Sequence, residues 1–149
     1  MAEVDCGFSD TPTSSGFDLL TTLGPTLVVD IGFDANHKNG IPVPGIKGVV
    51  ALVDTGATES CIDNLLAVQL GLPLVDKRPI AGSIGRHMAN VYLAQIHVPA
   101  LNFTITGTFA GVDLAAGGQT HKALIGRTFL KNFKMVYEGK TGVVKISHS

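Results

Sequence analysis

The residues best suited to chemistry lie in the stretch ALVDTGATES, residues 51–60, where a carboxylate follows an apolar run that favours a β-strand. Asp54 would end that strand, and VVALV would hold it from behind. Thr55 offers a hydroxyl for a hydrogen bond within the loop or across a partner chain, and Gly56 lets backbone approach the carboxylate with its N–H pointing inward. This pattern predicts a carboxylate held by backbone and hydroxyl donors. A turn without function is the alternative, because Asp and Gly are common turn residues.

Composition limits the class of protein that positions this carboxylate. The chain has 149 residues, of which 45% are hydrophobic and 15% charged, and its formal net charge is -1, which predicts one folded domain. It has no basic run and no apolar run long enough to span a bilayer, so we expect neither nucleic acid nor a membrane as a partner. Acidic residues near the start, where a secretory signal would carry Lys or Arg, predict a cytoplasmic protein. Its two cysteines, Cys6 and Cys61, form neither a disulfide framework nor, by themselves, a zinc site.

The elements expected around Asp54 are mostly strands. The 18 glycines and the many Val, Ile, Leu and Thr residues predict a sheet protein with tight turns. Strands are predicted at residues 26–33, 47–54, 91–98 and 102–109, with a C-terminal hairpin at 134–146. Helices are predicted at 63–71, with Asp63 as the N-cap, and for about two turns at 127–133. Residues 1–24 lack periodicity and are predicted to be a flexible arm with at most a short ordered piece at 17–20, which leaves 25–149 as the domain.

Two further motifs follow the carboxylate motif in a fixed order. A glycine-rich hairpin tip is expected at residues 82–85, and the run Leu124-Ile125-Gly126-Arg127 comes just before the predicted second helix. Together with the apolar strand and Asp-Thr-Gly-Ala, this ordered set resembles the retroviral-type aspartic proteases (retropepsins), including their single-domain bacterial members, over roughly residues 26–146. The resemblance implies an all-β fold: a closed β-barrel that is one half of an acid protease, with one helix after the active-site loop and a short helix near the C-terminus.

The same resemblance implies a role for each residue of these motifs. Asp54 is the implied catalytic residue, and its loop contains Thr55, Gly56 and Ala57. Thr55 would lock two such loops together across a dimer axis. The implied flap over the substrate consists of Gly82, Ser83, Ile84 and Gly85, with Ile84 as its apolar tip. Leu124 would line a substrate pocket, and the structural support would come from Ile125, Gly126 and Arg127.

The implied activity is that of an aspartic endopeptidase acting on a peptide or protein, without a metal or other cofactor. Only one Asp-Thr-Gly occurs in the chain, so two copies of Asp54 would have to meet in a homodimer. Thr58 stands where many retroviral members have an Asp that pairs with the later Arg, which leaves Glu59 or a backbone carbonyl as partner for Arg127. Retroviral members join their dimer with interleaved terminal strands, whereas this chain ends in its own hairpin. The sequence therefore does not define how the dimer interface is built. A peptide-binding or dimerisation module that does not hydrolyse peptides is the alternative function.

Overall fold

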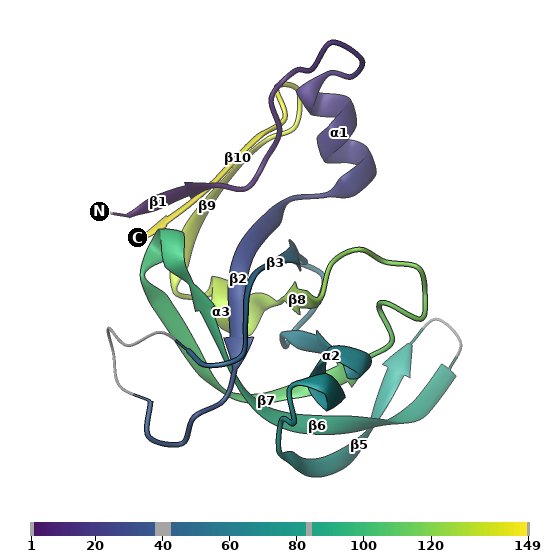
Figure 1. The fold of residues 1–149 in the computed structure, drawn as a ribbon. Helices are drawn as coiled ribbons and strands as arrows, with labels where there is room; N and C mark the ends of the chain where they lie inside the picture. The colour runs from purple at the N-terminus through teal and green to yellow at the C-terminus, as the bar shows by residue number, and fades with distance from the viewer. Residues whose placement is uncertain (1, 38–42, 83–84, 149) are drawn as a thin grey trace.

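The computed structural model describes residues 2–37, 43–82 and 85–148 (Figure 1). In this part of the chain the strands fall into two sheets. The strands are β1 (Glu3–Asp5), β2 (Thr26–Gly32), β3 (Ile46–Val53), β4 (Cys61–Asp63), β5 (Leu74–Gly82), β6 (Gly85–Val98), β7 (Phe103–Val112), β8 (Ala123–Ile125), β9 (Phe133–Glu138) and β10 (Val143–His148). The helices are α1 (Gly16–Leu23), α2 (Asn64–Gln69) and α3 (Arg127–Leu130), with a 3-10 turn, η1, at Pro99–Leu101. The predicted all-β class is confirmed.

The larger sheet closes into a barrel. Its hydrogen-bonded order is β2-β3-β8-β4-β7-β6-β5, and β6 also pairs back onto β2, with Ile31 opposite Ile96. The strands β3 and β8 are parallel, as are β4 and β7, while the other pairs in the barrel are antiparallel. Because β5 pairs only with β6, these two strands extend beyond the barrel as a two-stranded ribbon (Figure 1). Closure leaves few unpaired strand edges and encloses one core.

Alternation along the strands divides the barrel residues between core and surface. On β3, Ala51 and Val53 are buried, whereas Val50 and Leu52 point to the other face and remain partly exposed. Other fully buried side chains of the barrel core are Leu27, Val29, Ile31, Ile62, Ile96, Ala123 and Ile125. The strand that carries Asp54 is therefore fixed by its inward side chains, and its outward face is free to take part in a site.

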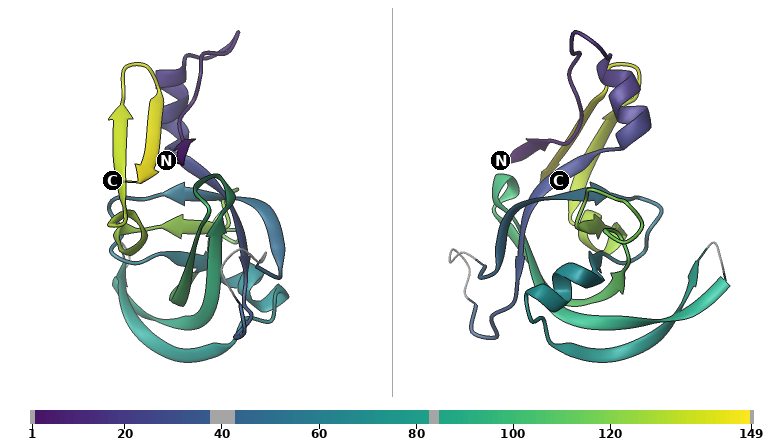
Figure 2. Two further views of the ribbon diagram at one scale, coloured as in Figure 1. Left: turned by 90° about the vertical axis from the view of Figure 1, so that its left-hand side faces the viewer. Right: turned by 45° about the vertical axis from the view of Figure 1, so that its right-hand side comes forward.

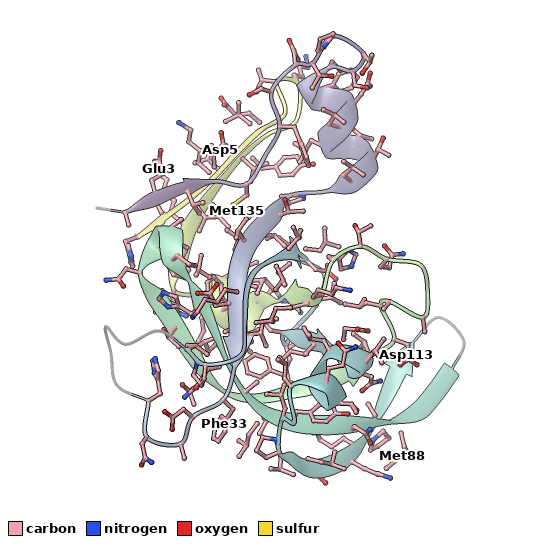
Figure 3. The ribbon with its side chains drawn as sticks, in the orientation of Figure 1. Glu3, Asp5, Phe33, Met88, Asp113 and Met135 are labelled. Atoms are coloured by element: carbon pink, nitrogen blue, oxygen red, sulfur yellow. The ribbon has the colours of Figure 1, made fainter. Side chains whose placement is uncertain are left out.

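The second sheet includes the segment that was predicted to be a flexible arm. Strand β1 pairs antiparallel with β10, with Val4 opposite Ile146, and β10 pairs with β9 (Figure 1). Glu3, labelled in Figure 3, forms an ion pair with Lys145 across this sheet at 3.5 Å. The sequence missed β1 because three residues carry no periodic pattern. The structure orders it by backbone pairing with a strand that lies at the other end of the chain.

Helix α1 is also longer than the short piece expected at residues 17–20. Ser15 is its N-cap and accepts a hydrogen bond from the Asp18 N–H at 3.1 Å. Leu20 is only 2% exposed and belongs to the same core as the barrel. The structure thus differs from the predicted arm because α1 buries one side chain in the core of the domain. The predicted fold also lacked this third helix.

Helix lengths and the ribbon are the other corrections. Asp63 caps α2 as predicted, but the helix runs only to Gln69. Helix α3 is a single turn instead of the expected two, because Phe133 is already in β9 and packs on the rings of Phe103 and Phe129 at 5.0 Å from each. Strand β5 was not among the predicted strands, since its sequence LVDKRPIAG has charged residues at its centre and contains Pro. No helix in the described ranges is long and apolar enough to cross a membrane.

Candidate active site

Asp54 lies immediately after β3, at the point where this strand leaves the barrel wall. Its N–H donates to the Ile125 carbonyl at 2.9 Å and so extends the β3–β8 ladder by one residue. Val53 behind it is 4% exposed, whereas Asp54 itself is half-buried. The barrel therefore fixes the backbone of Asp54 and leaves the carboxylate accessible.

The carboxylate is held by its own loop. The Gly56 N–H donates to Asp54 Oδ1 at 2.9 Å. A Cβ at residue 56 would lie 3.1 Å from the same oxygen, which is tighter than most contacts of real Cβ atoms, so a glycine suits this approach. The Ala57 N–H donates to the Asp54 carbonyl at 3.2 Å and closes the turn.

The start of α3 supports the other side of the Asp54 loop. The Arg127 N–H donates to the Ala57 carbonyl at 2.9 Å, and the Thr128 N–H donates to the Thr58 carbonyl at 3.0 Å. The Gly126 N–H donates to the hydroxyl of buried Ser60 at 3.0 Å. A Cβ on Gly126 would lie 2.5 Å from the Glu59 carbonyl oxygen, so only glycine fits. The backbone at residue 126 therefore packs directly on the backbone at Glu59, which is far away in the sequence.

The side chain of Arg127 resolves the alternatives left open by the sequence. Its Nη1 donates to the Thr55 carbonyl at 2.7 Å, and its Nη2 donates to the Thr58 hydroxyl at 3.0 Å. The sequence left Glu59 or a backbone carbonyl as the partner of Arg127, and the structure shows a backbone carbonyl, that of Thr55. Glu59 instead lies 3.4 Å from Arg78 on β5, in a pair whose side chains are 49% and 40% exposed. Arg127 thus spans the loop on both sides of Gly56, while Glu59 connects the loop to the ribbon.

Two of the four predicted flap residues, Gly82 and Gly85, lie in the ribbon of β5 and β6. Gly82 ends β5 and pairs with Gly85, the first residue of β6. Ser83 and Ile84, the predicted tip, lie outside the described residues. The ribbon reaches away from the barrel on the side of the 113–121 loop (Figure 1).

A pocket of about 450 Å³ opens on the outward face of β3. Val50 and Leu52 form its floor, and Asp54 is the next residue on that face because alternate residues of a strand point the same way. Leu124 pairs with Leu52 in register across β3 and β8 and is also half-buried, so it extends the same apolar face. The remaining lining residues are Phe8, Thr22, Leu23, Thr26, Gln119, Thr120 and His121.

Two anchors hold the 113–121 loop, which forms one wall of this pocket. Asp63 is 2% exposed, and its Oδ1 accepts the N–H groups of Leu114 and Ala115 at 3.0 and 3.1 Å. Its Oδ2 accepts the Leu66 N–H at 3.3 Å, which is the N-cap contact of α2. At the other end of the loop, the Lys122 N–H donates to the Val50 carbonyl at 2.8 Å. A single buried carboxylate therefore ties α2 to the pocket wall.

Burial shifts the pKa of two side chains near the loop and pocket, Cys61 and His121, toward the neutral form. Burial, and then the charges of Glu59 and Asp54, raise the pKa of the Cys61 thiol to about 11. Cys61 is therefore protonated at neutral pH and is a poor nucleophile. Burial lowers the pKa of His121 below its ordinary value of 6.5, so its imidazole is neutral in the pocket wall at neutral pH.

The sequence missed several residues that the structure brings to this site. Ser60 and Asp63 act through buried hydrogen bonds, and Phe8, Thr22 and Leu23 come from the segment predicted to be an arm. The spacing of Ser15 and Asp18 matches a capping pattern and could have predicted the start of α1. Nothing in the sequence indicated that α1 would lie beside β3.

Comparison with curated proteins gives one distant relative. No family model matches the chain. A UDP-N-acetylmuramate–L-alanine ligase from Chlorobaculum tepidum is 27% identical over 139 residues, which cover 92% of this chain. The match takes in 27% of the ligase, so the chain spans about a quarter of the length of this relative.

Comparison with solved structures identifies the class of fold. A retropepsin-like aspartic protease from Rickettsia conorii aligns with a TM-score of 0.54 and 12% identity, over 97% of this chain and 89% of that one. The EIAV protease in complex with the inhibitor HBY-793 aligns with a TM-score of 0.48 and 20% identity, over 72% of this chain and 85% of that one. The likeness to the Rickettsia protein shows that the chain has the retropepsin-like fold predicted from its motifs.

Proposed function

We infer that this chain is an aspartic endopeptidase whose active site forms when two copies of Asp54 meet in a homodimer. The observation that carries the proposal is the setting of Asp54 within a retropepsin-like fold. A half-exposed carboxylate is held by the Gly56 N–H at 2.9 Å, and a pocket with an apolar floor of Val50 and Leu52 lies along the adjoining strand face. A peptide side chain in that pocket would place its backbone near the carboxylate.

The chemistry follows from two carboxylates in contact. Like charges about 3 Å apart resist double ionisation, so the pair shares one proton. The ionised Asp54 accepts a proton from a water molecule, which attacks the scissile carbonyl carbon. The protonated Asp54 of the other copy donates a hydrogen bond to the carbonyl oxygen and stabilises the developing oxyanion. The Asp54 that took the water proton then gives it to the leaving nitrogen, and the tetrahedral intermediate collapses as its C–N bond breaks.

A free strand edge supports the homodimer. Strand β9 borders the smaller sheet, and within the described residues no strand pairs with its outer edge. In the left-hand view of Figure 2, β9 forms the left border of the hairpin, and β3 ends on this same side of the molecule. Val136 and Tyr137 on β9 are 41% and 54% exposed. One partner surface can therefore cover this edge and bring a second Asp54 loop close.

The sequence of β9 suits pairing with its own copy. An antiparallel pair of β9 strands centred on Val136 would place Lys134 opposite Glu138 of the second copy, twice per dimer. Both charged side chains are exposed in the single chain. Opposite charges at directly opposed positions of an antiparallel pair are favourable, whereas like charges are not. Thr55, exposed at the tip of the Asp54 loop, would then meet its counterpart near the axis.

The decisive experiment is cleavage of a proteome-derived peptide library by the wild-type protein and by Asp54→Asn. We expect the wild type to cut internal peptide bonds and the variant to lose activity by several orders of magnitude, because the variant lacks a general base but keeps its shape. Asp76→Asn is the matched control, since it makes the same change at an exposed position of β5 and should retain wild-type activity.

The alternative is a module that binds peptides without hydrolysing them, and the same experiment separates the two functions. Binding of library peptides by the wild type with no cleavage from acidic to neutral pH would favour the module. Equal cleavage by the wild type and Asp54→Asn would rule out the role assigned to this carboxylate.

A further inference from the structure

We propose that the N-terminal segment forms a wall of the substrate cleft, and that Leu23 on α1 selects the peptide side chain that enters the pocket beside Asp54. This inference rests on the proposed peptidase function and names a determinant of its specificity. The segment precedes β2, outside the region in which the motifs resemble retropepsins, so those motifs say nothing about it.

The pocket is a cleft with three sides. Its floor is the outward face of β3, with Val50 and Leu52, and one wall is the end of the 113–121 loop, including His121. The opposite wall comes from the N-terminal segment, where Thr22 and Leu23 lie at the end of α1. In Figure 1, α1 lies above the end of β3 and the 113–121 loop lies to its right. Without α1, the floor would be open on that side.

The pocket lies next to Asp54. Val50 and Leu52 share one face of β3, and Asp54, whose N–H continues the ladder just after the strand, is the next residue in that alternation. A strand rises by about 3.3 Å per residue, so Leu52 and Asp54 are separated by about 7 Å. Thr26, which pairs with Leu52 on β2, also lines the pocket. A peptide whose backbone reaches Asp54 can therefore place a neighbouring side chain over Leu52 and against Leu23.

Helix α1 is fixed firmly enough to act as a wall. The Gly16 N–H donates to Asp10 Oδ1 at 2.7 Å, and Leu20 is buried in the core. Gly16 also packs on the β9–β10 turn, where its backbone leaves no room for a Cβ on Gly142, which has a φ of +83°. The Gly24 N–H closes the helix by donating to the Leu20 carbonyl at 2.9 Å. Leu23 therefore faces the cleft from a held position although its side chain is 54% exposed.

The chemistry of the pocket indicates a bulky apolar side chain as its occupant. Val50, Leu52, Leu23 and Phe8 supply an apolar lining, and His121 is neutral at neutral pH because burial lowers its pKa. A volume of about 450 Å³ has room for a side chain as large as Phe or Leu with part of its backbone. Charged side chains would lose hydration there without gaining an ionic partner.

The test uses the full-length protein, a proteome-derived peptide library and two changes of Leu23. We expect Leu23→Lys to create a preference for Glu or Asp at one substrate position, because the new ammonium group would face that side chain. Leu23→Trp should fill the pocket and shift the preference at the same position from Leu or Phe to Ala or Val. For each variant, the ratio of kcat/KM between the two classes of peptide should change about tenfold or more.

Phe17→Lys is the matched control. Phe17 lies on α1 and is 48% exposed, like Leu23, but it does not line the pocket. It makes the same change of charge on the same helix and should keep the wild-type preference. A shifted preference for the Leu23 variants and an unchanged one for Phe17→Lys would support the proposal.

Two results would overturn the inference, and they differ in what they say about the proposed function. If the wild type cuts peptides but its preference is unchanged in both Leu23 variants, α1 is not a wall of the cleft while the peptidase function stands. If the wild type cuts no peptide at any pH tested, the proposed function and this inference fall together. Circular dichroism and thermal melts confirm that each variant is folded before the profiles are compared.

Discussion

At the residue scale, the candidate site depends on hydrogen bonds that hold a short loop from two sides. Gly56 contacts the Asp54 carboxylate from within the loop, and Arg127 contacts the Thr55 carbonyl and the Thr58 hydroxyl from outside it. The guanidinium fork suits two acceptors at once, which a lysine ammonium on a flexible stem does less well. The loop is therefore pre-organised by residues that need not touch substrate.

Replacing Arg127 with Met should loosen the loop. We expect the free energy of unfolding to fall by about 2 kcal/mol, because two hydrogen bonds to a charged group are lost at an exposed site. Cleavage should fall at least tenfold, since Asp54 would no longer be held in one position. Urea denaturation and peptide cleavage measure the two effects.

Arg78→Met is the control: it removes only an exposed ion pair with Glu59 and should cost less than about 1 kcal/mol. Equal losses in both variants would argue against a special role for Arg127.

His121 should make stability depend on pH. Because burial lowers its pKa below 6.5, the unfolded chain binds this proton more readily than the folded one. The contribution of His121 to stability is therefore complete above pH 6.5 and is lost as the pH falls through the folded pKa. Urea denaturation measures the free energy of unfolding at pH 7.5 and at pH 5. Between these two pH values, it should fall more for the wild type than for His121→Gln. An NMR titration with a midpoint at or above 6.5 for this imidazole would contradict the argument.

At the scale of elements, α2 and the 113–121 loop are joined by Asp63. This carboxylate caps α2 through the Leu66 N–H and holds the loop through the N–H groups of Leu114 and Ala115. Asp113, labelled in Figure 3, makes a second contact between the same elements by accepting a hydrogen bond from Asn64 Nδ2 at 2.8 Å. The two aspartates differ in burial, because Asp63 is 2% exposed while Asp113 is exposed to solvent.

Asp63→Ala should therefore destabilise the protein far more than Asp113→Ala. Removing Asp63 leaves three N–H groups without their acceptor in a buried setting, which should cost about 3 kcal/mol. The same change at Asp113 removes one exposed hydrogen bond and should cost less than about 1 kcal/mol. Urea denaturation of the two variants is the measurement. The structural argument fails if the two variants unfold at the same urea concentration.

At the scale of the whole molecule, one chain supplies half of the proposed active site. The end of β3, which Asp54 follows directly, and the edge of β9 lie on one side of the molecule (Figure 2). Within the described part of the chain, no strand pairs with the outer edge of β9. Two-fold symmetry would supply both partners at once. Activity should then rise more steeply than linearly with protein concentration near the dissociation constant of the dimer.

A charge swap on β9 tests this arrangement. Lys134→Glu alone, or Glu138→Lys alone, would place like charges opposite each other twice per dimer and should weaken dimerisation about tenfold. The double variant restores opposite charges and should recover both dimerisation and activity. Sedimentation velocity measures the dimer, and peptide cleavage measures the active site. A single variant that dimerises like the wild type would exclude pairing in this register, and a fully active monomer would exclude the shared site.

The sequence by itself determined the class of fold and singled out Asp54 as the candidate carboxylate. These predictions depend on local patterns that can be recognised in the sequence: strand alternation, the Asp-Thr-Gly-Ala motif and the run Leu124–Arg127. The N-cap role of Asp63 was likewise predicted, since capping involves residues a few positions apart.

Only the tertiary structure decided which distant segments meet. The partners of Arg127, the anchoring of the 113–121 loop by Asp63, and the position of α1 beside β3 all join residues far apart in the chain. Residues 1–24 look like a loose arm because their apolar side chains are too few and too scattered to form a periodic pattern. Residues 2–24 are ordered in the fold because β10 offers a strand edge to β1 and the core has room for Leu20. Such contacts depend on the shape of the whole barrel, which no short window of sequence contains.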